Sequence, residues 1–125
     1  MTKKYLKKIL EANVYDVADE TPLDLARNLS KQLNNQVLLK REDLQSVFSF
    51  KNRGAYNRIY QYTQKNNAAG IIAASAGNHA QGVALSASKL GIKATIVMPK
   101  TTPGIKVQAV RSYGAKIVLF GDSYG

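Results

Sequence analysis

The stretch that decides the fold is "GIIAASAGNHAQGVALSASKLGIKATIVM", residues 70–98. Its first part, "GIIAASA" (70–76), is an apolar, partly β-branched run behind a glycine, and this predicts a buried strand. Apolar residues then recur at helical spacing over residues 80–90, and Gly91 supplies a C-terminal stop. "KATIVM" (93–98) predicts a second strand. A strand, a helix and a strand with short connections indicate a parallel β–α–β unit.

The same kind of pattern extends in both directions from this unit. Towards the C-terminus we expect a helix over 103–113 and a third strand, "AKIVLF", over 115–120. Towards the N-terminus we expect helices over 3–13 and 50–65 and a short strand at "QVLLKRE" (36–42). In the second of these helices Ala55, Ile59 and Tyr62 share one side. Pro22 and Pro103 stand where helices are expected to begin. The fold class predicted is α/β, a parallel sheet with crossover helices.

Length and composition narrow the class of protein. A chain of 125 residues can build one ordinary core. It ends at "GDSYG" (121–125), where a further crossover helix is expected, so we expect residues 1–125 to be the N-terminal portion of a larger domain. The sequence has no cysteine, which excludes disulfides and thiol chemistry and suits a reducing compartment. No apolar run approaches the roughly 20 residues of a membrane span, and no signal peptide is evident. We expect a cytoplasmic protein.

The net charge of the chain suggests one class of partner to consider. There are 18 Lys and Arg residues against 8 Asp and Glu, a net charge of +10, and a basic domain can bind nucleic acid. However, the charge is spread evenly along the chain, and no helix-turn-helix, zinc-finger or RNP-like pattern is present. The one dense basic run, "KKYLKK" (3–8), fits a solvated helix face. We expect no nucleic-acid partner, with a basic nucleic-acid-binding module kept as the alternative from a different class.

The loop "SAGNHAQG" (75–82) follows the first predicted strand of the sheet. Ligands of open parallel sheets bind beyond the carboxyl ends of the strands, and the N–H groups that open the next helix suit a carboxylate or a phosphate. Ser75, Asn78 and His79 add polar side chains. Because His79 is the only histidine, a metal site of several histidines is excluded, and we expect no metal. Taken alone, the loop is a weak signal, because a Gly-Asn loop is more often a purely structural turn.

A second candidate lies in "SFKNRGA" (49–55). Ser49 is a good helix cap, which places Lys51 in the first turn, where the helix dipole repels an ammonium by ~0.3–1 kcal/mol. Arg53 is expected to add to the repulsion. Either Lys51 points into water, or its amine is needed uncharged, as a Schiff-base lysine would be.

The segments "KREDLQSVFSFKNRGA" (40–55) and "SAGNHAQGVA" (75–84) together resemble the pyridoxal-phosphate enzymes of the tryptophan-synthase-β fold type (fold type II). Within them the resemblance is to the serine and threonine dehydratases, above all those of the biosynthetic threonine type. It extends over essentially the whole chain. It implies pyridoxal 5'-phosphate as the cofactor and a lyase reaction, the β-elimination of L-threonine, and of L-serine, with release of ammonia. The product from threonine is 2-oxobutanoate, at the first step of isoleucine biosynthesis. A homo-oligomer, tetrameric in the family, is also implied.

The resemblance also implies roles for individual residues. Lys51 resembles the lysine that holds the cofactor through an imine bond and later takes the Cα proton of the substrate. Phe50 resembles the residue beside the cofactor ring, and Asn78 the asparagine that binds its phenolic oxygen. The loop that receives the substrate carboxylate corresponds to Ser75, Ala76, Gly77, Asn78 and His79.

The sequence departs from the family at two places. Asn52 stands where relatives usually have Leu or Ile, so we expect looser packing there. The family's glycine-rich loop for the cofactor phosphate and its serine at the pyridine nitrogen would follow residue 125, so we expect the isolated chain to be inactive. The alternatives left open are a catabolic serine/threonine dehydratase, a serine racemase and an inactive folded fragment. Racemases of the family carry a second serine where this sequence has Ala76.

Overall fold

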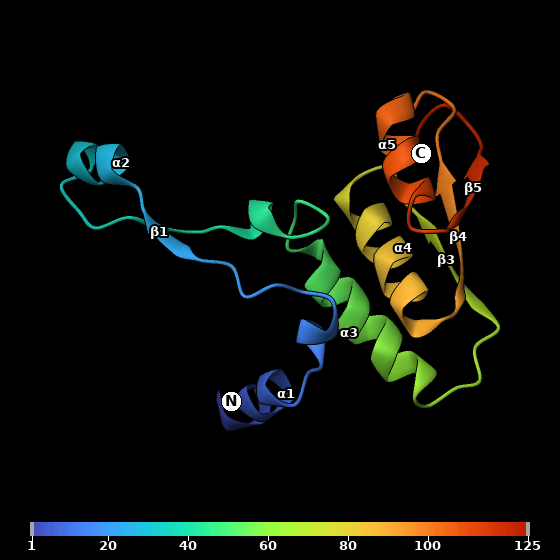
Figure 1. Cartoon of the computed structure of the whole chain (residues 1–125), viewed down its shortest axis with the longest axis horizontal. Helices are drawn as coiled ribbons and strands as arrows, with labels where there is room; N and C mark the ends of the chain where they lie inside the picture. Colours follow the sequence, from blue (N-terminus) through green and yellow to red (C-terminus); the bar gives the residue numbers. More distant parts are fainter. Residues whose placement is uncertain (1, 125) are drawn as a thin grey trace.

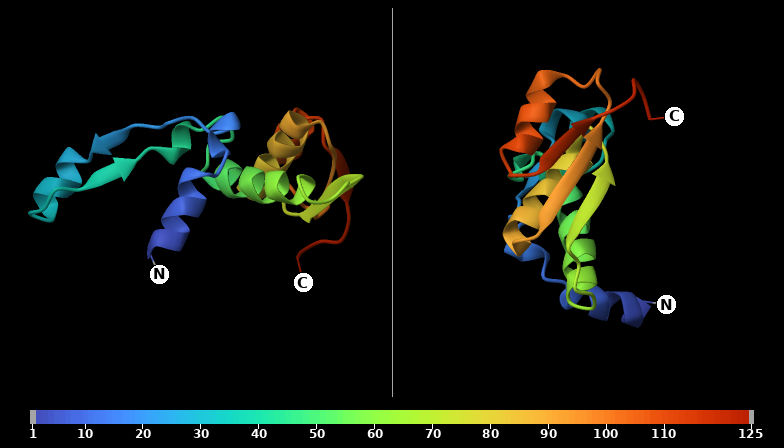
Figure 2. Two further views of the ribbon diagram at one scale, coloured as in Figure 1. Left: turned by 90° about the horizontal axis from the view of Figure 1, so that it is seen from below. Right: turned by 90° about the vertical axis from the view of Figure 1, so that its right-hand side faces the viewer.

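The computed structural model describes residues 2–124, and in its C-terminal half strands alternate with helices. The three strands are all parallel, and they pair in the order β3–β4–β5. Both crossover helices lie on the same face of the sheet (Figures 1 and 2). The elements are β3 (Gly70–Ala74), α4 (Asn78–Leu90), β4 (Lys93–Met98), α5 (Gly104–Arg111) and β5 (Lys116–Leu119). The predicted α/β class with a parallel sheet is confirmed, and Pro103 does precede a helix.

The core lies between this sheet and its helices. Alternate residues of the central strand, Ala94, Ile96 and Met98, are buried against α4 and α5, as the period of two in a strand requires. Helix α4 ends where predicted, because Gly91 adopts a left-handed conformation with φ of +66°, which glycine reaches without steric cost.

The prediction that residues 70–76 form a buried strand is only partly correct. The strand is there, but Ile72 is 77% exposed, whereas Ile71 and Ala73 pack against the core. Since α4 and α5 cover one face, the side chains of β3 that point to the other face meet no layer of the described chain. Only one face of this strand is therefore buried.

Helix α3 (Lys51–Thr63) precedes the sheet and packs along α4. Ala55 and Ile59 are buried at this contact, as their spacing predicts, while Tyr62 stays 44% exposed. Helices α3 and α4 lie side by side with their amino-terminal ends on the same side of the molecule (Figure 1).

The N-terminal half is less compact. Its β1 and β2 form an antiparallel pair, and with α2 between them they make an arm, residues 22–40, that extends away from the body (Figure 1). Pro22 does not begin a helix: an extended strand follows it, and its carbonyl accepts a hydrogen bond from the Arg41 N–H at 3.0 Å. The elements are α1 (Thr2–Leu10), β1 (Leu23–Leu25), α2 (Arg27–Gln32) and β2 (Leu38–Lys40), with single 3₁₀ turns at Val14–Asp16 and Glu42–Leu44.

Among residues 2–124, none of the helices combines the length and the apolar character that a membrane crossing demands.

Candidate active site

Lys51 is the first residue of α3, as the sequence predicts, although the helix begins without a side-chain cap. Phe50, not Ser49, takes the capping position, while the Ser49 hydroxyl accepts a hydrogen bond from the Lys51 N–H at 3.3 Å. The Lys51 side chain is exposed, and its Nζ lies 4.9 Å from the centre of the Phe50 ring. The first turn contains no acidic residue.

The second candidate segment lies at the carboxyl end of β3. Ser75 stays tied to the sheet because its N–H donates to the Val97 carbonyl at 3.1 Å. Its hydroxyl accepts a hydrogen bond from the Gly77 N–H at 3.4 Å, which tightens the turn into α4. Asn78 and His79, the first two residues of α4, are exposed, whereas Ser75 and Ala76 are half-buried. The turn therefore presents the unpaired N–H end of a helix together with polar side chains.

Gly82 brings these two segments together. A Cβ built on this glycine would lie 3.0 Å from the Lys51 carbonyl oxygen and 3.2 Å from the Asn52 nitrogen. The second turn of α4 therefore packs directly on the backbone that carries Lys51. A Cβ contact this close is rare, so glycine favours the approach. The lysine and the loop at the start of α4 therefore occupy one end of the α3–α4 pair.

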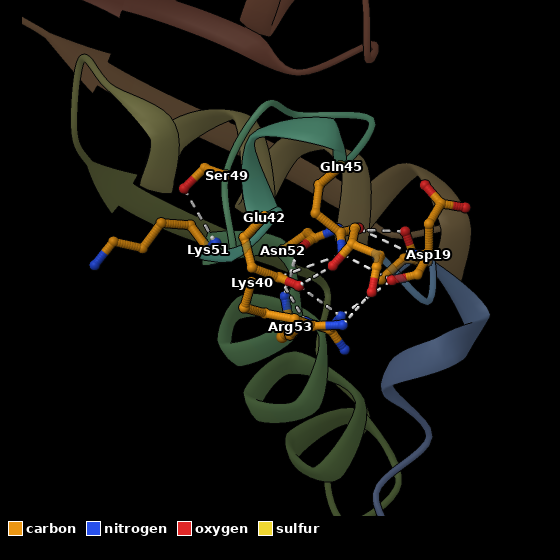
Figure 3. A network of polar contacts seen from close by, with 10 residues as sticks. Asp19, Lys40, Glu42, Gln45, Ser49, Lys51, Asn52 and Arg53 are labelled. Carbon is orange, nitrogen blue, oxygen red and sulfur yellow. Dashed lines mark hydrogen bonds and ion pairs between the residues drawn. The ribbon is translucent and has the colours of Figure 1, made fainter. Parts of the chain in front are cut away.

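A cluster of polar side chains surrounds the residues next to Lys51 (Figure 3). We call Glu42, Gln45, Asn52 and Arg53 the Glu42 cluster. Arg53 donates two hydrogen bonds to the Glu42 carboxylate, from Nε at 2.8 Å and from Nη2 at 3.0 Å. Asn52 donates to Gln45 Oε1 at 3.0 Å. The Arg53 hydrogen bonds lower the pKa of Glu42 to about 2, with burial opposing them only in part.

Two expectations about this region are wrong. Arg53 does not add to the positive field at Lys51 as a free charge, because its guanidinium is paired with Glu42, and Figure 3 shows the Lys51 side chain pointing away from the cluster. Asn52 does not loosen the packing, because it is fully buried and its amide is bonded on both sides. The polar Asn52 is accommodated at this buried position because Gln45 and the Arg53 N–H supply its hydrogen-bond partners.

A pocket of about 240 Å³ opens beside the loop, between α3, β3 and α4. His79 contributes to its wall together with Arg58 and Tyr62, but Lys51 is not among the lining residues. The described chain therefore brings the predicted site residues to one end of the helices without enclosing them in a single cavity.

Sequence reasoning gave no role to Glu42 or Gln45. Glu42 lies in a single 3₁₀ turn and Gln45 directly follows it. An element this short shows no periodic pattern in the sequence. One signal was available in the sequence. Lys51 and Arg53 lie at a helix start without an acidic residue, where positive charge is unfavourable, so a carboxylate from another segment is expected to pair with one of them.

The chain was then compared with known proteins. The model of the pyridoxal-phosphate dependent enzyme family matches residues 14–125. A biosynthetic chloroplastic threonine dehydratase of Arabidopsis thaliana is 63% identical over 97% of this chain and 20% of its own length. A biosynthetic L-threonine dehydratase of Burkholderia multivorans is 59% identical over 96% of this chain and 24% of its own length.

Solved structures agree with this result. The processed form of threonine deaminase isoform 2 from Solanum lycopersicum superimposes with a TM-score of 0.90 at 53% identity, over 96% of this chain and 33% of that one. Maize serine racemase gives a TM-score of 0.85 at 32% identity, over 93% and 35% of the two chains. This chain thus spans about a fifth to a quarter of the length of the curated relatives quoted. It belongs to the pyridoxal-phosphate dependent enzyme family.

Proposed function

We propose that residues 1–125 are the N-terminal portion of the catalytic domain of a threonine dehydratase, which converts L-threonine to 2-oxobutanoate and ammonia. Curated relatives that carry this name are 51–63% identical to the chain over 92–97% of its length. The observation that carries the proposal is the close approach at Gly82, which holds the backbone of Lys51 against the helix that begins at the "SAGNH" loop.

The residues present fit the cofactor of the family. Lys51 offers an exposed primary amine at a helix start, and the Phe50 ring next to it offers a flat apolar surface. Asn78 offers an exposed amide at the amino-terminal end of the neighbouring helix. When bound, pyridoxal phosphate supplies an aldehyde for the lysine amine and an electron sink for the substrate carbanion.

In this proposal each residue has a distinct task. Lys51 would hold the cofactor through a covalent bond to Nζ. Once the substrate amine has displaced Nζ from the cofactor, the freed neutral amine would accept the proton from the substrate Cα. Phe50 would pack beside the cofactor ring, and the Asn78 amide would donate a hydrogen bond to the cofactor. The N–H groups and polar side chains of residues 75–79 orient the substrate carboxylate, since a helix amino terminus favours an anion.

A racemase of the same fold is the main alternative. Serine racemase structures are similar to this chain at 29–32% identity, well below the 51–63% of the biosynthetic threonine dehydratases. Ala76 has no side chain that could deliver a proton to the opposite face of Cα, so elimination without inversion is favoured. We further propose a cytoplasmic homo-oligomer that binds neither nucleic acid nor membrane, although the name of the Arabidopsis relative places that protein in the chloroplast.

Two measurements on the holoenzyme test the proposal. Borohydride reduction followed by peptide mass analysis should place the cofactor on Lys51, and a label on another lysine would refute the assignment. Incubation with L-threonine and L-serine should yield 2-oxo acids with little D-amino acid. Release of D-serine at a rate comparable to that of pyruvate would favour the racemase instead.

A further inference from the structure

The Glu42 cluster closes a short loop that contains Lys51. The chain leaves the cluster at Gln45 and re-enters it at Asn52, and the hydrogen bond between these two amides joins the ends of the loop at 3.0 Å. The ion pair of Glu42 and Arg53 lies next to this closure and reinforces it. The loop is also held at its start, because the Tyr113 hydroxyl donates to the Ser46 carbonyl at 3.0 Å.

A third segment anchors the cluster to the rest of the fold. The Asp19 carbonyl accepts hydrogen bonds from Gln45 Nε2 at 2.8 Å and from Arg53 Nη2 at 3.0 Å, and the Asp19 N–H donates to Gln45 Oε1 at 2.9 Å. The Thr21 hydroxyl donates to Glu42 at 2.7 Å. Gln45 is 1% exposed and Asn52 is fully buried. Glu42 and Arg53 are half-buried. A network with buried members that all have partners is rigid, because breaking a bond to Gln45 or Asn52 leaves a buried polar group unpaired.

We propose that the Glu42 cluster positions Lys51, an inference that rests on the function proposed above for this lysine. The cluster residues do not touch the amine; they fix the backbone on both sides of it. Lys51 is long and flexible, so the place of its Nζ depends on where the backbone sets its Cα. A displacement of about 1 Å at a reacting group can lower a rate roughly a hundredfold. Glu42, Gln45, Asn52 and Arg53 are therefore positioning residues.

The cluster also reduces the unfavourable positive charge at the start of α3. Arg53 follows Lys51 by two residues, and an unpaired guanidinium there would add a second positive charge to the first turn. Glu42 neutralises it from another segment, and both carboxylate oxygens are occupied in doing so. Glu42 is thus not available to Lys51 as an ion-pair partner, and the amine is left for chemistry.

The test compares two neighbouring substitutions in the holoenzyme. Glu42→Gln keeps the size of the side chain and removes its charge. Asp43→Asn makes the same change one residue later, where the carboxylate pairs with Arg41 at the surface at 2.7 Å and takes no part in the cluster. We expect Glu42→Gln to lower kcat roughly tenfold to a hundredfold with KM little changed, and to alter the visible circular dichroism of the bound cofactor. Asp43→Asn should change neither.

Each outcome decides between explanations. If borohydride still labels Lys51 in Glu42→Gln but kcat and the dichroism equal those of the unmodified enzyme, positioning is refuted and the proposed function stands. If Asp43→Asn has the same effects, the cluster has no specific role and the proposal also fails. If borohydride labels another lysine in the unmodified enzyme, the proposed function itself is wrong. Should Glu42→Gln not fold, Arg53→Lys decides by the same criteria, because it keeps the cation and loses only the two-pronged geometry.

Discussion

Replacing Gly82 by alanine is the sharpest test of how α3 and α4 fit together. The added Cβ would lie 3.0 Å from the Lys51 carbonyl oxygen, 3.1 Å from its carbonyl carbon and 3.2 Å from the Asn52 nitrogen. All three are backbone atoms of a helix start, so no flexible side chain can move aside. The two helices must separate by a few tenths of an ångström, and the displacement falls on Lys51.

Two opposing terms set the size of the effect on the free energy of unfolding. Overpacking of this kind costs about 1–3 kcal/mol, while alanine in a helix interior is favoured over glycine by about 1 kcal/mol. The net result for Gly82→Ala is a destabilisation of about 0–2 kcal/mol. Gly54→Ala is the matched control, because Gly54 lies in α3, is exposed, and a Cβ there would meet nothing within 4 Å. This control should gain about 1 kcal/mol.

Urea unfolding of the 125-residue chain and of the two variants measures both effects. The difference between the variants, about 1–3 kcal/mol, does not depend on the helix-propensity term because both replace glycine by alanine inside a helix. If Gly82→Ala were as stable as Gly54→Ala, the helices would not be in the close contact described, and the argument that this contact fixes Lys51 would be refuted.

Three further predictions concern ionisation and activity. The folded chain holds the pKa of Glu42 at about 2, against an ordinary value of 4.5. This group therefore adds roughly 1–3 kcal/mol to the free energy of unfolding above pH 4.5, and the contribution is lost as the pH falls towards 2. Unfolding measured as a function of pH should show this loss, and the Glu42→Gln variant should show a smaller dependence on pH in this range. Burial and the hydrogen bond to Asp16 raise the pKa of Tyr56 from 10.0 to about 12, so its contribution is complete below pH 10 and declines as the pH rises towards 12. Tyr56→Phe should unfold about 1–2 kcal/mol more easily at neutral pH and lack that alkaline decline; an unchanged pH profile would contradict the assignment. Finally, the 125-residue chain alone, given excess pyridoxal phosphate, should not form 2-oxobutanoate from L-threonine, and turnover matching that of a full-length relative would contradict this.

The parts of the fold that were predictable from the sequence are those with a regular local pattern. The segments 70–74, 78–90 and 93–98 alternate between periods of two and 3.6 residues, and the burial of β4 and α4 follows those periods. By contrast β1 has only three residues and α2 only six, and Ala26 at the N-cap of α2 supplies no side-chain cap. Such short elements carry too few repeats to be recognised.

The candidate site divides in the same way. Lys51 and the loop at 75–79 were predicted as site residues because each belongs to a local motif with a chemical reason for its residues. The Glu42 cluster was not identified, because its hydrogen bonds join positions 26 and 34 residues apart, from Asp19 to Gln45 and to Arg53. No periodicity extends over such a separation. The sequence does show that Arg53 lies near a helix start without an acidic residue in its first turn. Only the folded chain shows that the Glu42 carboxylate pairs with it.

The source of that carboxylate matters for the chemistry. Asp and Glu are enriched in the first turn of helices, where a negative charge interacts favourably with the helix dipole. An acid in the first turn of α3 would also lie within reach of Lys51 and would stabilise its charged ammonium. Helix α3 has no acidic residue in its first turn. The charge that compensates Arg53 comes from Glu42 on a separate segment, and the Glu42 carboxylate oxygens are already bonded to Arg53 and Thr21. The arrangement stabilises the helix start and leaves Lys51 without an acidic partner in the first turn, as the role proposed for its neutral amine requires.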